Sequence, residues 1–199
     1  MKSLLYYIQE KLIIKKNKYK YFPKTKEKLK SIIKKRIKAE GNEVDLNDID
    51  VSNIKDMSKL FVETDFNGDI STWDVSNVVD MSYMFYGCAN FNSDISNWDV
   101  SNVTNMKEMF HICRKFNQDI SNWDVSNVKD MSYMFAYCQA FNQDISSLDV
   151  SNVENMECMF DNCKSFNQDI SSWDVSKVTN MSFMFKNCKI EEKYKPKFK

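Results

Sequence analysis

The sequence predicts an α/β repeat protein, a solenoid in which each 25-residue coil supplies one short parallel strand and one short helix. Phenylalanine, tryptophan, methionine and cysteine each recur at the same place in successive 25-residue units. A fixed period of about 20–50 residues is typical of solenoids, whereas a propeller blade needs about 40 residues or more. The chain has only 3 Gly and 2 Pro in 199 residues, which argues against linker or collagen-like sequence.

Five complete units follow one incomplete coil that begins at residue 50. The alignment rests on four columns of identical spacing: Phe66, Phe91, Phe116, Phe141 and Phe166; Trp73, Trp98, Trp123, Leu148 and Trp173; Met81, Met106, Met131, Met156 and Met181; Cys88, Cys113, Cys138, Cys163 and Cys188.

The second half of each unit predicts a short helix. Its apolar residues fall at i, i+3, i+6, i+7 and i+10, as on one helical face. A short polar residue such as Asn105 precedes them and is expected to cap the first turn. The stripe in one unit consists of Val103, Met106, Met109, Phe110 and Cys113.

The first half of each unit predicts an extended strand. Phe91 and Ile95 share one strand face, while Trp98 and Val100 have the opposite parity, so we expect a bend between them. The run 99–102 has Asp, Ser and Asn side chains that favour a turn. One coil is therefore predicted to consist of a strand, a turn, a helix and a second turn. A single coil cannot bury its apolar residues alone, so the coils must stack.

The string FNQDISNWDVSNVKDMSYMFAYC (116–138) resembles the 25-residue repeat of BspA-like leucine-rich-repeat proteins, the mycoplasma-type surface-protein repeat of unassigned function. The resemblance covers residues 50–188. It implies a leucine-rich-repeat-like solenoid that binds proteins or cell surfaces. The family's repeated residues are a structural consensus, so the resemblance implies no catalytic site. Leu148 replaces the repeated tryptophan in one coil.

Three segments are predicted: a basic helical N-terminal cap (1–49), the repeats (50–188) and a basic disordered tail (189–199). Thr25 is a plausible N-cap, Leu29 and Ile33 begin an apolar face, and Gly41 stops this helix. An earlier helix is expected from about Ser3 to Lys16. The short tail leaves the last coil thinly covered, which predicts self-association through the C-terminal edge.

The zero net charge hides an asymmetry. Residues 1–44 carry 14 basic and 4 acidic residues, and residues 45–188 carry 9 basic and 22 acidic ones. The lysine-rich N-terminus, with aromatic residues among the lysines, allows nucleic-acid or anionic-membrane binding. We favour instead the solvated outer face of a cap helix.

The repeated polar residues and cysteines suit structural roles better than metal binding. The aligned aspartates could hold calcium between coils, but turn formation explains them more simply. The cysteine column fits small buried thiols better than zinc ligands. Cys158 lies outside that column and is the best candidate for a reactive thiol, although an ordinary surface cysteine is the simpler reading. The asparagine column predicts hydrogen bonds between coils.

No motif predicts catalysis, and no cofactor is expected. The one histidine, the absence of a nucleophile–base pair and the absence of a phosphate-binding loop favour a non-enzyme. No window has the roughly 18 apolar residues of a membrane span, and the apolar stretch near Met1 is too short for a signal peptide. We expect a cytoplasmic protein, or a cell-surface one if a leader has been removed.

The predicted function is a non-catalytic protein–protein interaction scaffold. Positions on the helix side vary between coils, and recognition of a specific partner needs such variation. A flat periodic ligand would use the invariant strand face instead. The alternative function is tethering to nucleic acid or membrane by the basic N-terminus. Five helix-side aromatic residues are the candidate partner-binding site: Tyr83, Tyr86, His111, Tyr133 and Tyr137.

Overall fold

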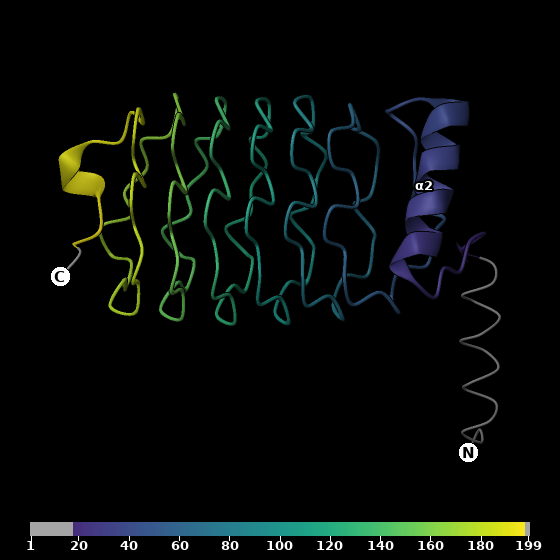
Figure 1. Cartoon of the computed structure of the whole chain (residues 1–199), viewed down its shortest axis with the longest axis horizontal. Helices are drawn as coiled ribbons and strands as arrows, with labels where there is room; N and C mark the ends of the chain where they lie inside the picture. Colours follow the sequence, from purple (N-terminus) through teal and green to yellow (C-terminus); the bar gives the residue numbers. More distant parts are fainter. Residues whose placement is uncertain (1–17, 198–199) are drawn as a thin grey trace, which may run out of the picture.

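The computed structural model of the chain describes residues 18–197. Its coils stack side by side along the long axis of the molecule, with a helix, α2 (Lys26–Glu40), across the N-terminal end (Figure 1). The 3-10 helix η1 (Glu192–Tyr194) lies at the opposite end. The helix expected from Ser3 to Lys16 falls outside the described residues.

The prediction of a strand and a helix in every coil is wrong. Within residues 18–197 the regular elements are α2 and η1, and no strand forms. The protein is therefore not an α/β leucine-rich-repeat-like solenoid, and its coils are built from turns. Isolated parallel bridges mark the contacts between neighbouring segments: Tyr21–Ile49, Asp56–Asp80, Asp80–Asn105, Asn105–Asp130, Asp130–Asn155 and Asn155–Asn180.

Consecutive turns replace the predicted helix. In residues 81–88 the N–H groups of Met84, Tyr86 and Cys88 each donate to the carbonyl three residues earlier, at 2.9–3.2 Å. Tyr83 and Gly87 have φ of +58° and +74°, which interrupts any α-helical run. Three-residue turns bring residues at i, i+3, i+6 and i+7 to the core just as a helix would. Apolar spacing alone therefore cannot separate the two structures.

We call residues 80–88 and their equivalents in the other coils the turn ladder, because they join each coil to the next. Every second N–H donates to a carbonyl of the following coil, and the four such bonds between each pair of coils measure 2.7–3.0 Å. The N–H groups of Met81, Tyr83 and Phe85, for example, donate to the carbonyls of Asn105, Lys107 and Met109. All these donors point toward the C-terminal end of the stack, and all the acceptors point toward the N-terminal end.

The short polar residue predicted to cap a helix caps the first turn of the ladder instead. Asn105 Oδ1 accepts from the Lys107 N–H at 3.0 Å, and Asp80 Oδ1 accepts from the Ser82 N–H at 2.8 Å. This is an Asx turn, in which the side chain bonds the backbone two residues on. The capping chemistry was predicted correctly although the element that it caps was not.

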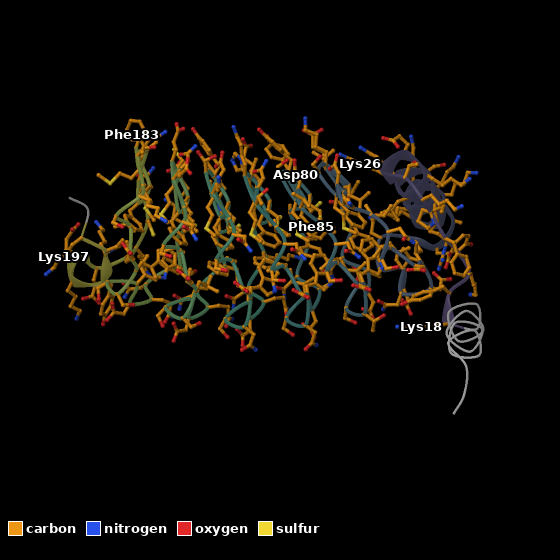
Figure 2. All side chains as sticks on the ribbon, turned by 90° about the horizontal axis from the view of Figure 1, so that it is seen from below. Lys18, Lys26, Asp80, Phe85, Phe183 and Lys197 are labelled. Carbon is orange, nitrogen blue, oxygen red and sulfur yellow. The ribbon has the colours of Figure 1, made fainter. Side chains whose placement is uncertain are left out.

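The core runs through all coils as a continuous column of aromatic rings. Phe110 stacks on Phe116 of its own coil at 4.0 Å between ring centroids, and on Phe85 and Phe135 of its neighbours at 5.7 and 5.8 Å. These rings are at most 1% exposed. Figure 2 shows Phe85 inside the stack and Phe183 projecting from its surface. Because the core is shared between coils, each coil depends on its neighbours for burial.

Side chains, rather than strand backbones, link the coils in the segment predicted as a strand. Trp98 Nε1 donates to the Ile70 carbonyl at 3.2 Å, and the Asn92 N–H donates to Asn67 Oδ1 at 2.7 Å. The same two bonds recur in other coils, at 3.0–3.2 Å for tryptophan and 2.7–2.9 Å for asparagine. In this segment of the described chain, such side-chain links hold the coils in register in place of a backbone ladder.

Helix α2 closes the N-terminal end as predicted. Thr25 Oγ1 accepts from the Lys28 N–H, and Gly41, at φ +92°, ends the helix with its N–H bonded to the Ile37 carbonyl. Leu29 and Ile33 are 0% and 2% exposed within the hydrophobic core.

The C-terminal segment departs from the predicted disordered tail. Residues 189–197 lie against the last coil, where the Glu191 N–H donates to Asn167 Oδ1 at 2.9 Å. The Ile170 N–H donates to the Tyr194 carbonyl at 3.0 Å. These bonds continue the asparagine side of the stack, but within residues 18–197 no backbone group accepts from the inter-coil N–H groups of the last turn ladder.

Candidate docking surface

Many of the variable side chains, although not Tyr86 and His111, are carried by left-handed positions of the turn ladder. Each coil has two ladder residues with positive φ, and at these positions the sequence differs from coil to coil. Except at Cys158, which is buried, the residues at these positions are half-buried or exposed. The residues concerned are Lys59 and Glu63, Tyr83 and Gly87, Glu108 and Ile112, Tyr133 and Tyr137, Cys158 and Asn162, and Phe183 and Asn187.

The five predicted site residues form one continuous chain of ring contacts, which we call the aromatic track. Tyr83 and Tyr86 lie 5.9 Å apart between ring centroids, and the Tyr86 ring meets His111 edge-on at 5.1 Å. His111 in turn stacks against Tyr133 at 5.7 Å and Tyr137 at 5.9 Å. The track thus crosses three consecutive coils, with His111 at its centre.

Charged groups lie along the aromatic track. His111 Nδ1 is 3.0 Å from Glu108 Oε2, and the Tyr133 hydroxyl donates to Glu157 Oε1 at 3.1 Å. The Lys59 ammonium lies 5.1 Å from the Tyr83 ring centroid, within cation–π range. The track is therefore an aromatic strip with acidic residues beside it and with Lys59 and Lys107 next to Tyr83 at its N-terminal end.

Burial and hydrogen-bonding neighbours raise the pKa of Tyr83 and of Tyr133. The pKa of Tyr83 is raised by burial and by Glu108. The pKa of Tyr133 is raised by its bond to the Cys158 sulfur, by burial and by Glu157. Both hydroxyls remain hydrogen-bond donors at neutral pH. Tyr137 is 41% exposed, while the other four members are half-buried, so Tyr137 is the most accessible ring.

The repeated aspartates act as turn formers. Asp99 Oδ1 accepts from the N–H and the hydroxyl of Ser101 at 3.1 and 2.6 Å, and Asp119 Oδ1 accepts from the Ser121 N–H at 2.9 Å. Hydrogen bonds to Ser101 lower the pKa of Asp99. In the described part of the chain, no group of three or more His, Cys, Asp or Glu side chains could hold a metal ion.

The cysteine column fills the core as predicted. The thiol of Cys113 donates to the Phe85 carbonyl of the preceding coil at 3.0 Å, and burial raises its pKa well above the usual range. Cys158 was expected at the surface but is only 6% exposed, and its thiol lies within hydrogen-bonding reach of the Tyr133 side chain. Burial also raises the pKa of Cys158, which makes this thiol a poor nucleophile.

Some basic side chains of the N-terminal segment form ion pairs with acidic residues of the same chain. Lys26 Nζ bonds the Asp56 carboxylate at 2.9 Å, and Arg36 bonds Asp48 at 2.8 Å and also pairs with Glu40. The outer lysines of α2, among them Lys34, are exposed. No helix in residues 18–197 is long and apolar enough to cross a membrane.

A family model, described as a Mycoplasma protein of unknown function, DUF285, matches residues 27–136 and 97–196. The chain belongs to this family. No curated protein and no solved structure matches the chain. The family match extends upstream of the repeats into α2, so the cap helix and the coils are matched together.

The five residues that variation between coils predicts as a site lie in mutual contact, and their role in binding stays a prediction. The sequence did not predict the left-handed backbone at three of them. The available signal was the mixture of residue types at one column, where Tyr83, Glu108 and Cys158 alternate with no shared helix propensity. A left-handed backbone is disfavoured for most residues other than Gly, Asn and Asp, yet these positions hold several residue types. Ile112, at φ +66°, shows that the stack holds even a β-branched residue there.

Proposed function

We propose that the protein is a non-catalytic scaffold that binds another protein through the aromatic track. The observation that carries this proposal is the unbroken contact of Tyr83, Tyr86, His111, Tyr133 and Tyr137 on the variable side of the stack. Tyrosine is enriched at binding hot spots because it combines a large rigid ring with a hydroxyl. A continuous strip of such rings gives one partner several adjacent anchors.

The stacked coils support this role because they fix the positions of the rings. The ladder bonds of 2.7–3.0 Å fix the spacing of successive coils, so the rings are held in place before a partner arrives. Preorganisation of this kind lowers the entropic cost of binding. The resemblance of the repeat to BspA-like surface-protein repeats belongs to the same proposal and favours a protein or cell-surface partner.

The test compares alanine variants on and off the aromatic track. Tyr86→Ala and Tyr137→Ala together remove the most accessible ring and two of the ring contacts of His111. Phe22→Ala removes an aromatic residue that is 47% exposed elsewhere. We expect the double variant to lose a discrete protein that the unaltered chain captures from host lysate, and the Phe22 variant to retain it. Circular dichroism establishes that both variants stay folded. Equal capture by the double variant would refute the proposal.

Tethering by the basic N-terminus is the alternative proposal, supported by the exposed lysines on the outer face of α2. Binding of that kind should weaken steeply with salt, since it depends on released counterions. Lys34→Glu should then abolish retention on nucleic acid or anionic vesicles. If binding tolerates salt and responds to the aromatic track alone, the alternative is wrong.

A further inference from the structure

The last coil ends in a row of backbone donors. In each earlier coil four alternate ladder N–H groups donate to the next coil, as those of Met156, Cys158, Phe160 and Asn162 do. In the last coil the equivalent groups have no recorded acceptor within residues 18–197. We call this row the donor edge; it consists of the N–H groups of Met181, Phe183, Phe185 and Asn187.

The donor edge carries partial positive charge. In the turn ladder every inter-coil N–H points toward the C-terminal end, so the peptide dipoles are aligned across successive coils. A row of parallel N–H groups attracts anions, as helix N-termini and backbone nests do. A β-strand edge differs, because it alternates donors with acceptors.

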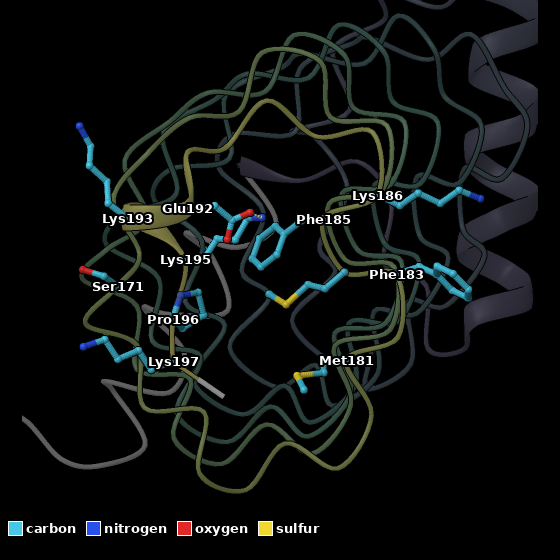
Figure 3. Close-up of a pocket in the computed structure, with 11 residues that line it drawn as sticks. Ser171, Met181, Phe183, Phe185, Lys186, Glu192, Lys193, Lys195, Pro196 and Lys197 are labelled. Atoms are coloured by element: carbon cyan, nitrogen blue, oxygen red, sulfur yellow. Dashed lines mark hydrogen bonds and ion pairs between the residues drawn. The ribbon is translucent and has the colours of Figure 1, made fainter. Parts of the chain in front are cut away.

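The surface beside the donor edge is apolar and basic. Met181 is 42% exposed, whereas the equivalent methionines of the four preceding coils are at most 1% exposed. A depression of about 600 Å³ opens here, and its lining includes four lysines and one glutamate. In Figure 3, Phe185 points into the coil interior, while Phe183 and Lys186 point away from it. Phe183 is 67% exposed, the most exposed large apolar residue of the described chain.

A second copy of the chain does not complement this edge. Contact between two C-terminal ends would place N–H donors against N–H donors. Head-to-tail stacking would instead require the row of carbonyl acceptors on the first coil. Helix α2 covers that end, since Leu29 and Ile33 are buried in the core and Lys26 bonds both Asp56 and Ser58. The geometry thus disfavours the self-association predicted from the sequence.

We propose that the donor edge binds an acidic, extended segment of a partner protein. Carboxylates and carbonyls of the segment accept from the four N–H groups, and its apolar side chains cover Met181 and Phe183. The donors occur at every second residue, and an extended peptide likewise presents alternate side chains on one face. Lys186 and Lys197, for which no ion pair is recorded in the described range, add positive charge at the rim. This surface is separate from the aromatic track.

The first test measures hydrogen exchange with a defined probe, a fluorescein-labelled peptide of alternating Asp and Leu residues. By NMR, the four donor-edge N–H groups of the free protein should exchange faster than those of Met156, Cys158, Phe160 and Asn162. Saturating peptide should slow the exchange of the edge groups and leave the rest unchanged. Peptide that binds without this protection, or does not bind at millimolar concentration, would overturn the proposal. Edge protection that rises with protein concentration alone would assign the edge to a second copy and would also overturn it.

The second test removes single donors and charges. Ligation of recombinant 1–162 to a synthetic 163–199 beginning at Cys163 allows the amide N–H of Phe183 to be replaced by an ester oxygen, with every side chain kept. Loss of one charge-assisted hydrogen bond should weaken peptide binding about tenfold or more, measured by anisotropy. Lys186→Glu with Lys197→Glu should also weaken binding, and the matched variant Lys34→Glu at the opposite end should not. Undiminished affinity in the ester, or equally tight binding and edge protection by an oligonucleotide, would contradict the proposal.

Discussion

Leu148 offers a test of what holds the coils together, because tryptophan occupies its position in the four other complete coils. The Ile95 carbonyl accepts two bonds, from the Trp98 N–H and from Trp123 Nε1, both at 3.2 Å. The Ile120 carbonyl accepts from the Trp123 N–H at 3.1 Å, and Leu148 cannot supply the second donor. Leu148→Trp should restore the missing link between two coils.

The expected gain is about 1 kcal/mol, the usual net value of one intramolecular hydrogen bond. The larger ring should fit, because Trp98 already lies between two coils that carry tryptophan at the same position, and it is 3% exposed. For a chain of this size the gain corresponds to a rise of roughly 2–4 °C in the thermal unfolding midpoint. Leu148→Phe is the matched control, since it adds an aromatic ring without an N–H donor.

Urea unfolding followed by circular dichroism measures the difference in the free energy of unfolding between variants. The comparison of urea midpoints requires that this free energy falls with urea concentration at the same slope in every variant. We expect Leu148→Trp to raise the midpoint and Leu148→Phe to leave it near that of the unaltered chain. A lowered midpoint for Leu148→Trp, or an equal rise for Leu148→Phe, would refute the inference that the indole N–H links the coils.

Three further predictions follow from the cap, the turns and the thiols. Leu29→Ala should destabilise the protein by about 2–5 kcal/mol in the same assay, because it leaves a cavity between α2 and the coils, and Lys28→Ala should have little effect. Hydrogen bonds to Ser121 lower the pKa of Asp119. The stabilisation by Asp119 is therefore present above the unfolded pKa of about 3.9 and is lost as pH falls through the folded pKa. The urea midpoint should fall in acid, and it should fall less in Asp119→Asn. A thiol reagent should modify Cys188, the one half-buried cysteine, before the five buried ones, and all six after unfolding; uniform reactivity in the folded state would contradict the burial of the column.

The sequence allowed the repeat and its core to be predicted because both depend on which residues are apolar. The phenylalanine column and the first four members of the cysteine column are buried where the period places them, while Cys188 of the last coil is half-buried. Helix α2 begins after Thr25 and ends at Gly41 as its capping residues indicate. The identity of the backbone elements could not be predicted in the same way. Residues such as Met81, Met84 and Phe85 reach the core equally well from a helix or from three-residue turns.

The candidate site was predicted as a set of residues but not as a surface. Variation between coils identified the rings of the aromatic track, while their mutual contacts depend on left-handed backbone at Tyr83, Tyr133 and Tyr137. Nothing in the residue types there demands positive φ. The donor edge has no sequence signal, because it consists of backbone N–H groups whose direction is set by the turn ladder.

Site-specific photo-crosslinking from the aromatic track tests the proposed function most directly. A benzoylphenylalanine placed at position 137, the most exposed position of the track, should crosslink to one discrete host protein. The same residue at position 122, on the exposed turn before Trp123, should not crosslink to that protein. Crosslinking of the same protein from position 122 but not from position 137 would place binding on the invariant side and contradict the account.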